Sequence, residues 1–259
     1  MQPQKSQVKA TLLQNTRIKG DYFCAELLME AIPQNALPGQ FIHVQIPDLN
    51  HRVLRRPFSI FNVEEKRLSL LYKVVGEGTK QLSYTSPGKE LDIVGPLGRP
   101  FSPLPEKSII VAGGYGCAAT YLLAKNAPVK PMVLIGGRTK EDILLKEEYE
   151  ALGCEVRIST DDGSTGFHGR VTQLLQQVIA GQTWLAACGP IPMLKALAEL
   201  MPTLNLKGEL SLDKAMCCGV GACFACVAKV KDATSPDGWR YARVCAEGPV
   251  FKAEELIFA

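Results

Sequence analysis

Four cysteines fall within the stretch CCGVGACFAC, which begins at Cys217, and a fifth, Cys245, follows further along the chain. Thiols gathered in this way can form disulfides, bind zinc or hold an iron–sulfur cluster. The spacing Cys218-x4-Cys223-x2-Cys226 with a distal cysteine is the plant-type arrangement for a [2Fe–2S] cluster. The sequence therefore predicts Cys218, Cys223, Cys226 and Cys245 as metal ligands.

Two other interpretations of these cysteines remain open. A zinc site usually combines a C-x2–4-C knuckle with a second pair, whereas Cys245 stands alone; such a site would make the tail a docking module without enzymatic activity. A disulfide framework fits less well, because nine cysteines cannot all pair. Gly219 and Gly221 favour the cluster, since they allow a loop to wrap closely and point N–H groups at sulfur. Cys217 is predicted to be a buried neighbour, because choosing Cys218 preserves the x4 spacing.

Glycine-containing loops follow four apolar runs in the middle of the chain, where a nucleotide could bind: GGYG (113–116), GGR (136–138), TDDGSTG (160–166) and CGP (188–190). The glycines of the first loop let the backbone approach a phosphate, with a helix N-terminus behind them; they are Gly113, Gly114 and Gly116. The last loop offers a small residue and then a turn, which suits a nicotinamide ring; its residues are Cys188, Gly189 and Pro190. The alternative is that each loop is only a tight strand-to-helix turn.

Two carboxylates, Asp161 and Asp162, follow the third apolar run. Carboxylates at this position can accept hydrogen bonds from ribose hydroxyls and would repel a 2′-phosphate. The sequence therefore predicts NADH in preference to NADPH. The alternative is that TDDG serves only as a turn, for which Asp-Gly is well suited.

A second group of motifs lies in the first part of the chain. In RRPFSIFNV, Arg56 could bind a pyrophosphate through two hydrogen bonds, and Ser59 could bond the edge of a flavin ring. In LYKVVGEGT, Gly76 and Gly78 open a loop, and Thr79 offers a hydroxyl and an N–H to phosphate. Taken alone, each motif could be an ordinary strand with a polar edge.

The elements that must position these residues fall into three segments. Residues 1–102 contain short apolar runs separated by Gly and Pro, which indicates an antiparallel, all-β small barrel. Residues 103–207 alternate four apolar strands with four helical segments, which indicates a parallel sheet with crossover helices. Residues 208–259 have few periodic stretches, so we expect something other than their own core to hold them together.

The composition narrows the class of protein. The chain has 259 residues, of which 46% are hydrophobic and 21% charged, and its net charge of +3 gives no reason to expect nucleic acid or a membrane as a partner. No apolar run would span a bilayer, and the start MQPQKSQVKA lacks the apolar region of a secretory signal. We therefore expect a cytoplasmic protein. The four scattered cysteines are expected to be small buried hydrophobes; they are Cys24, Cys117, Cys154 and Cys188.

These motifs, in this order, resemble those of the ferredoxin–NADP reductase superfamily: R-P-F-S, G-x-G-T, G-G-x-G and C-G-P. The C-terminal residues 208–259, called the cysteine segment below, and the stretch TDDGSTGFHG narrow the resemblance to the electron-transfer subunits of dihydroorotate dehydrogenase. The resemblance implies an FAD-binding barrel (1–102), an NAD-binding α/β domain (103–207) and a [2Fe–2S] segment (208–259). It also implies flavin contacts in three stretches, formed by Arg56, Pro57, Phe58, Ser59, Leu71, Tyr72, Lys73, Gly78 and Thr79.

The implied function is electron transfer in pyrimidine biosynthesis. Electrons would pass between NAD(H), FAD, the [2Fe–2S] cluster and the FMN of a separate catalytic subunit, in a heterotetramer with two copies of each subunit. No residue of this chain is expected to act as a catalytic acid or base. A related possibility is a reductase subunit of a sulfide dehydrogenase or hydrogenase complex.

Overall fold

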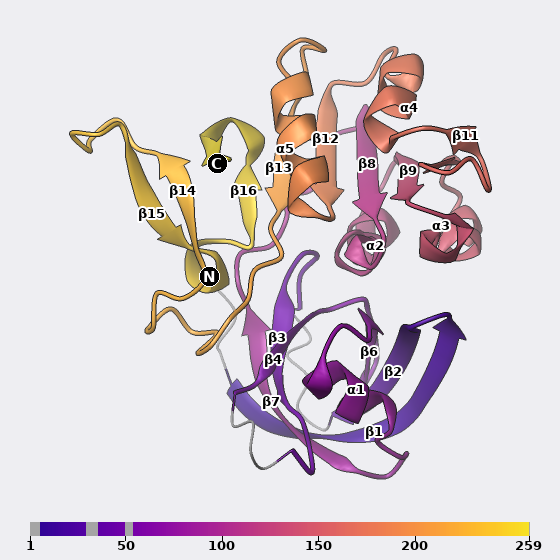
Figure 1. Cartoon of the computed structure of the whole chain (residues 1–259), viewed down its shortest axis with the longest axis vertical. Helices are drawn as coiled ribbons and strands as arrows, with labels where there is room; N and C mark the ends of the chain where they lie inside the picture. The colour runs from indigo at the N-terminus through magenta and orange to yellow at the C-terminus, as the bar shows by residue number, and fades with distance from the viewer. Residues whose placement is uncertain (1–5, 30–35, 50–53, 259) are drawn as a thin grey trace.

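Three β-sheets organise the protein, and the computed structural model describes residues 6–29, 36–49 and 54–258. The first sheet lies at the bottom of Figure 1, the second lies above it among the helices, and the third forms the yellow hairpin region beside the second. None of the helices in these residues is long and apolar enough to cross a membrane.

The first sheet is antiparallel, with seven strands in the order β4-β3-β7-β1-β2-β6-β5. It curls, because β4 and β6 approach each other although they are not hydrogen-bonded neighbours. The strands are β1 (Ser6–Lys19), β2 (Tyr22–Met29), β3 (Phe41–Gln45), β4 (Arg56–Ser59), β5 (Asn62–Glu64), β6 (Arg67–Lys73) and β7 (Glu90–Leu97).

Alternation of inward and outward side chains explains this curled sheet. Leu12, Leu27 and Ile93 are fully buried in its interior, while their strand neighbours are more exposed. The predicted antiparallel barrel is thus confirmed. One element was missed: α1 (Glu77–Ser83) is a short helix that starts after Gly76, in a segment predicted to be a loop. It buries Leu82, and that packing outweighs the glycine-rich composition.

The second sheet has the order β11-β10-β9-β8-β12-β13-β16, and all its pairs are parallel except β13 with β16. Its strands are β8 (Ser108–Gly113), β9 (Met132–Gly137), β10 (Val156–Thr160), β11 (Phe167–His168), β12 (Trp184–Cys188), β13 (Lys207–Ser211) and β16 (Val250–Lys252). The four predicted strands are confirmed as β8, β9, β10 and β12. Strands β13 and β16 extend this sheet beyond β12, and their residues come almost entirely from the segment 208–259 that was predicted to bind a cluster.

Helices connect these strands as predicted: α2 (Gly116–Asn126), α3 (Lys146–Ala151), α4 (Val171–Val178) and α5 (Ile191–Leu200). The second predicted helix is shorter than expected and is preceded by a 3-10 turn, η1 (Lys140–Asp142). Leu145 has a φ of 60° there, which breaks the helix. Leu144 and Leu145 are buried in the hydrophobic cluster between sheet and helices, so packing overrides the helical pattern.

The third sheet has the order β15-β14-β17, formed by β14 (Val227–Lys231), β15 (Trp239–Arg243) and β17 (Leu256–Ile257). Two short helices accompany it, α6 (Val244–Glu247) and η2 (Ala253–Glu255). This segment has no hydrophobic core separate from that of the second sheet, which agrees with the expectation that something other than its own core holds it together. Val230, Ala242 and Val244 belong to the same buried cluster as Leu197 and Leu210 of the second sheet and its helix α5.

Candidate functional site

The two loops predicted to contact a nicotinamide nucleotide meet at the carboxyl edge of the second sheet. GGYG follows β8 and CGP follows β12, and these neighbouring strands lie where the strand order reverses. A Cβ on Gly116 would lie 2.3 Å from the carbonyl oxygen of Cys188, and one on Gly113 would lie 2.9 Å from Cδ of Pro190. Only glycine allows so close an approach. Open α/β sheets bind ligands in the crevice at such a reversal point.

The TDDG turn follows β10 at the same edge of the sheet. The Asp162 carboxylate accepts hydrogen bonds from the N–H and the hydroxyl of Ser164, at 2.9 Å and 2.6 Å, and these lower the pKa of Asp162. Asp161 is exposed, and its carboxylate has no hydrogen-bond or ion-pair partner among the described residues. The turn interpretation therefore accounts for Asp162, while Asp161 is available to a ribose.

The two motifs of the first sheet also come together. A Cβ on Gly78 would lie 2.7 Å from Nε of Arg56, so the guanidinium of the RPFS motif covers the start of α1. The Thr79 hydroxyl oxygen accepts hydrogen bonds from the N–H groups of Val75 and Gly76, at 2.9 Å and 3.2 Å. This hydroxyl therefore serves to cap the helix.

The predicted flavin-contacting residues of β6 lie in different surroundings. Tyr72 is 3% exposed and packs edge-on against Phe58 inside the first sheet, so its side chain belongs to the core. Leu71 is buried on the opposite side, in the cluster shared with the second sheet. Lys73 reaches outward, and its Nζ lies 3.4 Å from Oδ1 of Asp142. Only the backbone of Leu71 and Tyr72 is left to contact a ligand.

A pocket of about 700 Å³ separates the first sheet from the cysteine segment. One wall consists of residues from β4 and the start of α1, including Arg56, Pro57, Gly78 and Thr79. The opposite wall comes from the cysteine segment and includes Ala215, Met216, Cys217 and Ala225. The predicted flavin motifs thus line the same pocket as Cys217 and Ala225, which are direct neighbours of the predicted ligands Cys218 and Cys226.

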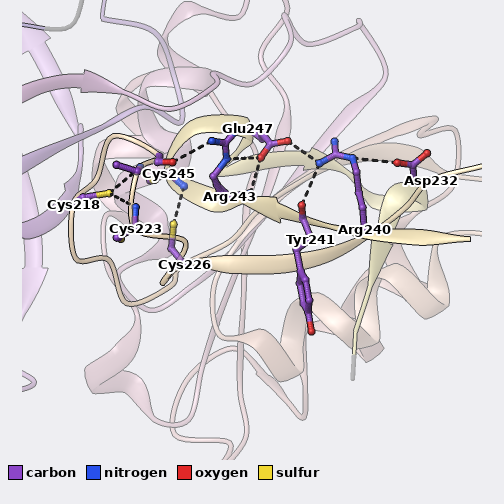
Figure 2. A network of polar contacts seen from close by, with 11 residues as sticks. Cys218, Cys223, Cys226, Asp232, Arg240, Tyr241, Arg243, Cys245 and Glu247 are labelled. Atoms are coloured by element: carbon purple, nitrogen blue, oxygen red, sulfur yellow. Dashed lines mark hydrogen bonds and ion pairs between the residues drawn. The ribbon is translucent and has the colours of Figure 1, made fainter. Parts of the chain in front are cut away.

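Cys218 and Cys223, the first two predicted metal ligands, form one pair, in which Cys218 is half-buried and Cys223 is exposed (Figure 2). The N–H groups of Ala222 and Cys223 donate to Sγ of Cys218, at 3.3 Å and 3.4 Å. Although burial alone would raise it, hydrogen bonds from Val220, Cys223 and Ala222 lower the pKa of Cys218 to about 6. The backbone therefore favours a thiolate at Cys218, the form that binds metals.

The other two ligands form a second, buried pair. The N–H of Cys245, near the start of α6, donates to Sγ of Cys226 at 3.3 Å. Burial, together with the neighbouring Cys226 and Cys218 thiols, raises the pKa of Cys245 to about 12. A thiol in this setting ionises only when a bound cation compensates for the burial.

The donor set fits a [2Fe–2S] cluster better than it fits a zinc ion. Two thiol pairs, with N–H groups aimed at sulfur, suit two irons that each take two cysteines. Gly219 and Gly221 have φ values of 69° and 91°, as the cluster interpretation expects.

The prediction for Cys217 was wrong. Cys217 is exposed and lines the pocket, since it lies just outside the loop that the N–H groups of Ala222 and Cys223 close on Sγ of Cys218. Of the four scattered cysteines, Cys117, Cys154 and Cys188 are buried as predicted, and Cys24 is half-buried.

Three further groups complete the site, and sequence reasoning did not identify them. His43 of β3 is 1% exposed, and neither ring nitrogen has a hydrogen-bond partner of ordinary geometry. Burial, and then the charges of Arg55 and Arg56, lower the pKa of His43 to about 4, so the ring is neutral at pH 7. A Cβ on Gly219 would lie 2.5 Å from Nδ1 of His43, so this ring supports the cysteine loop.

A second missed group joins the first two sheets. The Tyr22 hydroxyl donates to Oδ1 of Asp142 at 2.6 Å, and Lys73 donates to the Tyr22 oxygen at 3.1 Å. Burial opposes ionisation of Asp142, but the Tyr22 hydrogen bond and the Lys73 charge outweigh it and lower the pKa of Asp142. Residues 22 and 142 are too far apart in the chain for any local pattern to have linked them.

A third missed group ties the two ligand-bearing segments together (Figure 2). Arg243 donates through a guanidinium nitrogen to the Gly221 carbonyl at 3.1 Å and through Nε to Glu247 at 3.0 Å. Arg240 donates to the other oxygen of Glu247 at 2.7 Å. Two Arg residues in the short run before the distal cysteine, Arg240 and Arg243, are the sequence signal that points to this group.

Known proteins match both the cysteine segment and the whole chain. Residues 213–257 match the iron–sulfur cluster binding domain of dihydroorotate dehydrogenase B. The chain is 40% identical over 252 residues to "Dihydroorotate dehydrogenase B (NAD(+)), electron transfer subunit" of Caldanaerobacter subterraneus subsp. tengcongensis, covering 97% of this chain and 98% of the relative. The protein of the same name from Geobacillus kaustophilus is 40% identical over 229 residues, or 85% and 86% of the two chains.

A solved structure shares the fold almost completely. It is the structure of an NADH-dependent reduced ferredoxin-NADP oxidoreductase, described for flavin-based electron bifurcation. It has a TM-score of 0.83 and 26% identity, and the alignment covers 96% of this chain and 89% of that chain.

The curled sheet, the parallel sheet and the cysteine segment together define an electron-transferring oxidoreductase of the ferredoxin–NADP reductase type. Within that class, the chain belongs to the family of dihydroorotate dehydrogenase B electron transfer subunits. The fold class and the family predicted from sequence are thereby confirmed. The individual residues predicted to contact FAD, NAD and iron remain predictions.

Proposed function

We propose that this protein transfers electrons between NAD(H) and the FMN of a dihydroorotate dehydrogenase catalytic subunit, through FAD and a [2Fe–2S] cluster. The names of its relatives support this assignment. The observation that carries it is the shared pocket, whose walls include Arg56 and Pro57 of the RPFS motif and the GEGT motif on one side and Cys217 on the other. Cys217 directly precedes the proposed ligand Cys218, so the flavin pocket and the cluster are separated by one peptide unit along the chain.

The residues of the pocket would bind and orient the flavin. Arg56 would pair with the diphosphate, and Pro57 and Ser59 on β4 would contact the ring system. When bound, FAD supplies the conversion between the two-electron chemistry of a nicotinamide and the one-electron chemistry of an iron–sulfur cluster. Gly78, with no side chain, leaves room for the Arg56 guanidinium beside this ligand.

The loops at the carboxyl edge of the second sheet would bind NAD(H). Gly113, Gly114 and Gly116 would approach its phosphates, and Asp161 would bond a ribose hydroxyl. The Cys188–Pro190 loop would sit beside the nicotinamide. The hydroxyl of Tyr115, in the same glycine loop, donates to Asp213 at 2.7 Å, so the nucleotide loop also contacts the start of the cysteine segment.

The four cysteines would hold the cluster next to the partner subunit. Electron transfer requires the cluster and the partner's FMN to be close, and the loop itself carries two exposed apolar side chains: Val220 is 43% exposed and Phe224 is 58% exposed. Exposed apolar side chains that lie together mark interaction surfaces. We therefore place the catalytic subunit over this loop, in a heterotetramer with two copies of each subunit and in the cytoplasm.

The functional units proposed from sequence are 1–102 for FAD, 103–207 for NAD and 208–259 for the cluster. They do not coincide with the sheets throughout, because β13 and β16 belong to the second sheet. We propose them as units of cofactor binding.

Spectroscopy and a two-protein assay test the proposed function. Purified protein should show flavin bands overlaid by broad iron–sulfur absorption, with two irons and one FAD per chain. It should oxidise NADH with artificial acceptors but leave dihydroorotate unchanged until the catalytic subunit is added. A colourless protein with one zinc, or dihydroorotate oxidation by the isolated chain, would contradict the proposal.

A further inference from the structure

The side chain of Arg243 lies between the two segments that carry the predicted ligands (Figure 2). On one side it donates to the carbonyl oxygen of Gly221 at 3.1 Å, in the middle of the loop between Cys218 and Cys223. On the other side Arg243 is the last residue of β15 and directly precedes α6, which contains Cys245. One guanidinium therefore bridges the loop with three ligands and the helix with the fourth.

This guanidinium is held from several directions. Its Nε donates to Oε2 of Glu247 at 3.0 Å, and the backbone N–H of Arg243 donates to the same oxygen at 2.8 Å. Its central carbon lies 5.1 Å from the centre of the Phe224 ring, which is in the loop itself. Arg240 donates to Oε1 of Glu247 at 2.7 Å, which fixes that carboxylate in turn. These partners hold the planar guanidinium in the orientation in which it reaches the loop.

The space around Gly221 shows that the fit is tight. Gly221 has a φ of 91°, and a Cβ placed on it would lie 2.9 Å from Cβ of Ala246 in α6. The loop therefore comes as close to the helix as a glycine allows, and the Arg243 hydrogen bond closes that contact. A change at Arg243 would be transmitted directly to the separation between the two ligand-bearing segments.

We propose that Arg243 is a positioning residue for the cluster, which holds the loop against α6 and whose positive charge raises the reduction potential of the bound cluster. This inference rests on the proposed [2Fe–2S] site. A cluster gains one negative charge when it accepts an electron, so a nearby cation stabilises the reduced form. Hydrogen bonds and charges around the ligands are among the means by which proteins set such potentials.

The test compares three variants of the full chain with bound cofactors. Arg243→Gln removes the charge and the fork of hydrogen bonds, and Arg243→Lys keeps the charge alone. Lys229→Gln is the matched control, because it also removes a cation from the three-stranded sheet, but Nζ of Lys229 lies over the Trp239 ring at 4.0 Å and not on Glu247. The measurements are iron and sulfide per chain, and the midpoint potential from a redox titration followed by electron paramagnetic resonance.

We expect Arg243→Gln to shift the midpoint potential to a more negative value, or to lose cluster, while Lys229→Gln stays close to the unmodified protein. Arg243→Lys should recover most of the potential. The inference is overturned if Arg243→Gln keeps both full iron content and an unchanged potential. It is also overturned if Lys229→Gln produces the same change. Absence of a cluster in the unmodified protein would contradict the proposed function, which is a distinguishable result.

Discussion

The imidazole of His43 lies directly beneath the backbone of Gly219: a Cβ on that glycine would be 2.5 Å from Nδ1. His43 belongs to β3 of the first sheet and pairs in register with Pro57, whereas Gly219 directly follows the predicted ligand Cys218. The buried His43 side chain therefore packs between the strand that carries Pro57, in the proposed flavin site, and the loop that carries Cys218, in the proposed cluster site. The distance between flavin pocket and cysteine loop is set by this contact and by the surrounding backbone.

Replacing Gly219 with alanine should loosen the cysteine loop. The change adds a methyl group against His43 and places a side chain at a φ of 69°, which costs about 1 kcal/mol by itself. We expect reduced iron content and faster loss of the cluster to a chelator. Gly238→Ala is the matched control, because its φ is 72° but nothing lies within 4 Å of the added methyl group. Equal iron retention in the two variants would show that the His43 contact is unimportant.

The two adjacent cysteines should behave differently. Cys218→Ser should remove the iron–sulfur absorption, because Cys218 accepts two backbone N–H bonds inside the loop. Cys217→Ser should keep the cluster, because Cys217 faces the pocket. Iron and sulfide assays on both purified variants measure this difference. The ligand assignment would be reversed if Cys217→Ser lost the cluster and Cys218→Ser kept it.

The contact between the first two sheets should depend on the Asp142 carboxylate. Asp142→Asn removes the charge that accepts hydrogen bonds from Tyr22 and Lys73, and we expect a loss of about 1–2 kcal/mol in the free energy of unfolding at pH 7. Because the pKa of Asp142 is lowered in the folded state, this contribution is present above about pH 4 and is lost as the pH falls below it.

Chemical denaturation of the two proteins measures this free-energy difference. Glu150→Gln provides the control, since Glu150 pairs with Lys146 on an exposed helix surface and should contribute about 0.5 kcal/mol or less. A loss for Asp142→Asn no larger than that of the control would rule out a stabilising role for the contact.

Nucleotide preference should follow Asp161 and not its neighbour. The unmodified protein should prefer NADH, and Asp161→Ser should narrow the NADH-to-NADPH ratio of kcat/KM by about tenfold, or ~1.4 kcal/mol. Asp162→Asn should change that ratio much less, because the Asp162 carboxylate is already occupied by Ser164. Steady-state kinetics with an artificial acceptor compare the three proteins. A preference for NADPH in the unmodified protein would refute the role of Asp161.

The parts of the site that sequence could predict are those encoded locally. Cysteine spacing identified the candidate ligands, and alternating apolar strands and helices identified the parallel sheet with its loops. These signals lie within short stretches, where residue type and spacing directly determine geometry. The short helix α1 escaped because glycines at its start resemble a loop, while the burial of Leu82 that stabilises it depends on the folded sheet.

The supporting residues could not be predicted because their partners are distant in the chain. His43 and Gly219 are in contact only after the first sheet and the cysteine segment have folded together. The same holds for Tyr22 with Asp142, which belong to different sheets or their connections. The prediction that Cys217 is buried failed for a related reason. Whether a residue beside a tight loop faces inward or outward depends on which distant residues pack against it.

Strands β13 and β16 pair with each other, with Ser211 opposite Val250, and the Leu212 N–H donates to the Pro249 carbonyl at 2.9 Å. The chain therefore leaves the second sheet and returns to it at adjacent points, so residues 212–249, which include the four predicted ligands, are an insertion between two paired strands, and β17 beyond β16 pairs with β14 of the insertion. An insertion anchored at both ends cannot swing on a single tether to meet its electron donor and acceptor in turn. The partner subunit would then dock on a cluster site that is fixed to the second sheet, and a protein engineer could exchange that site by grafting at the two neighbouring strand ends and replacing β17 with it.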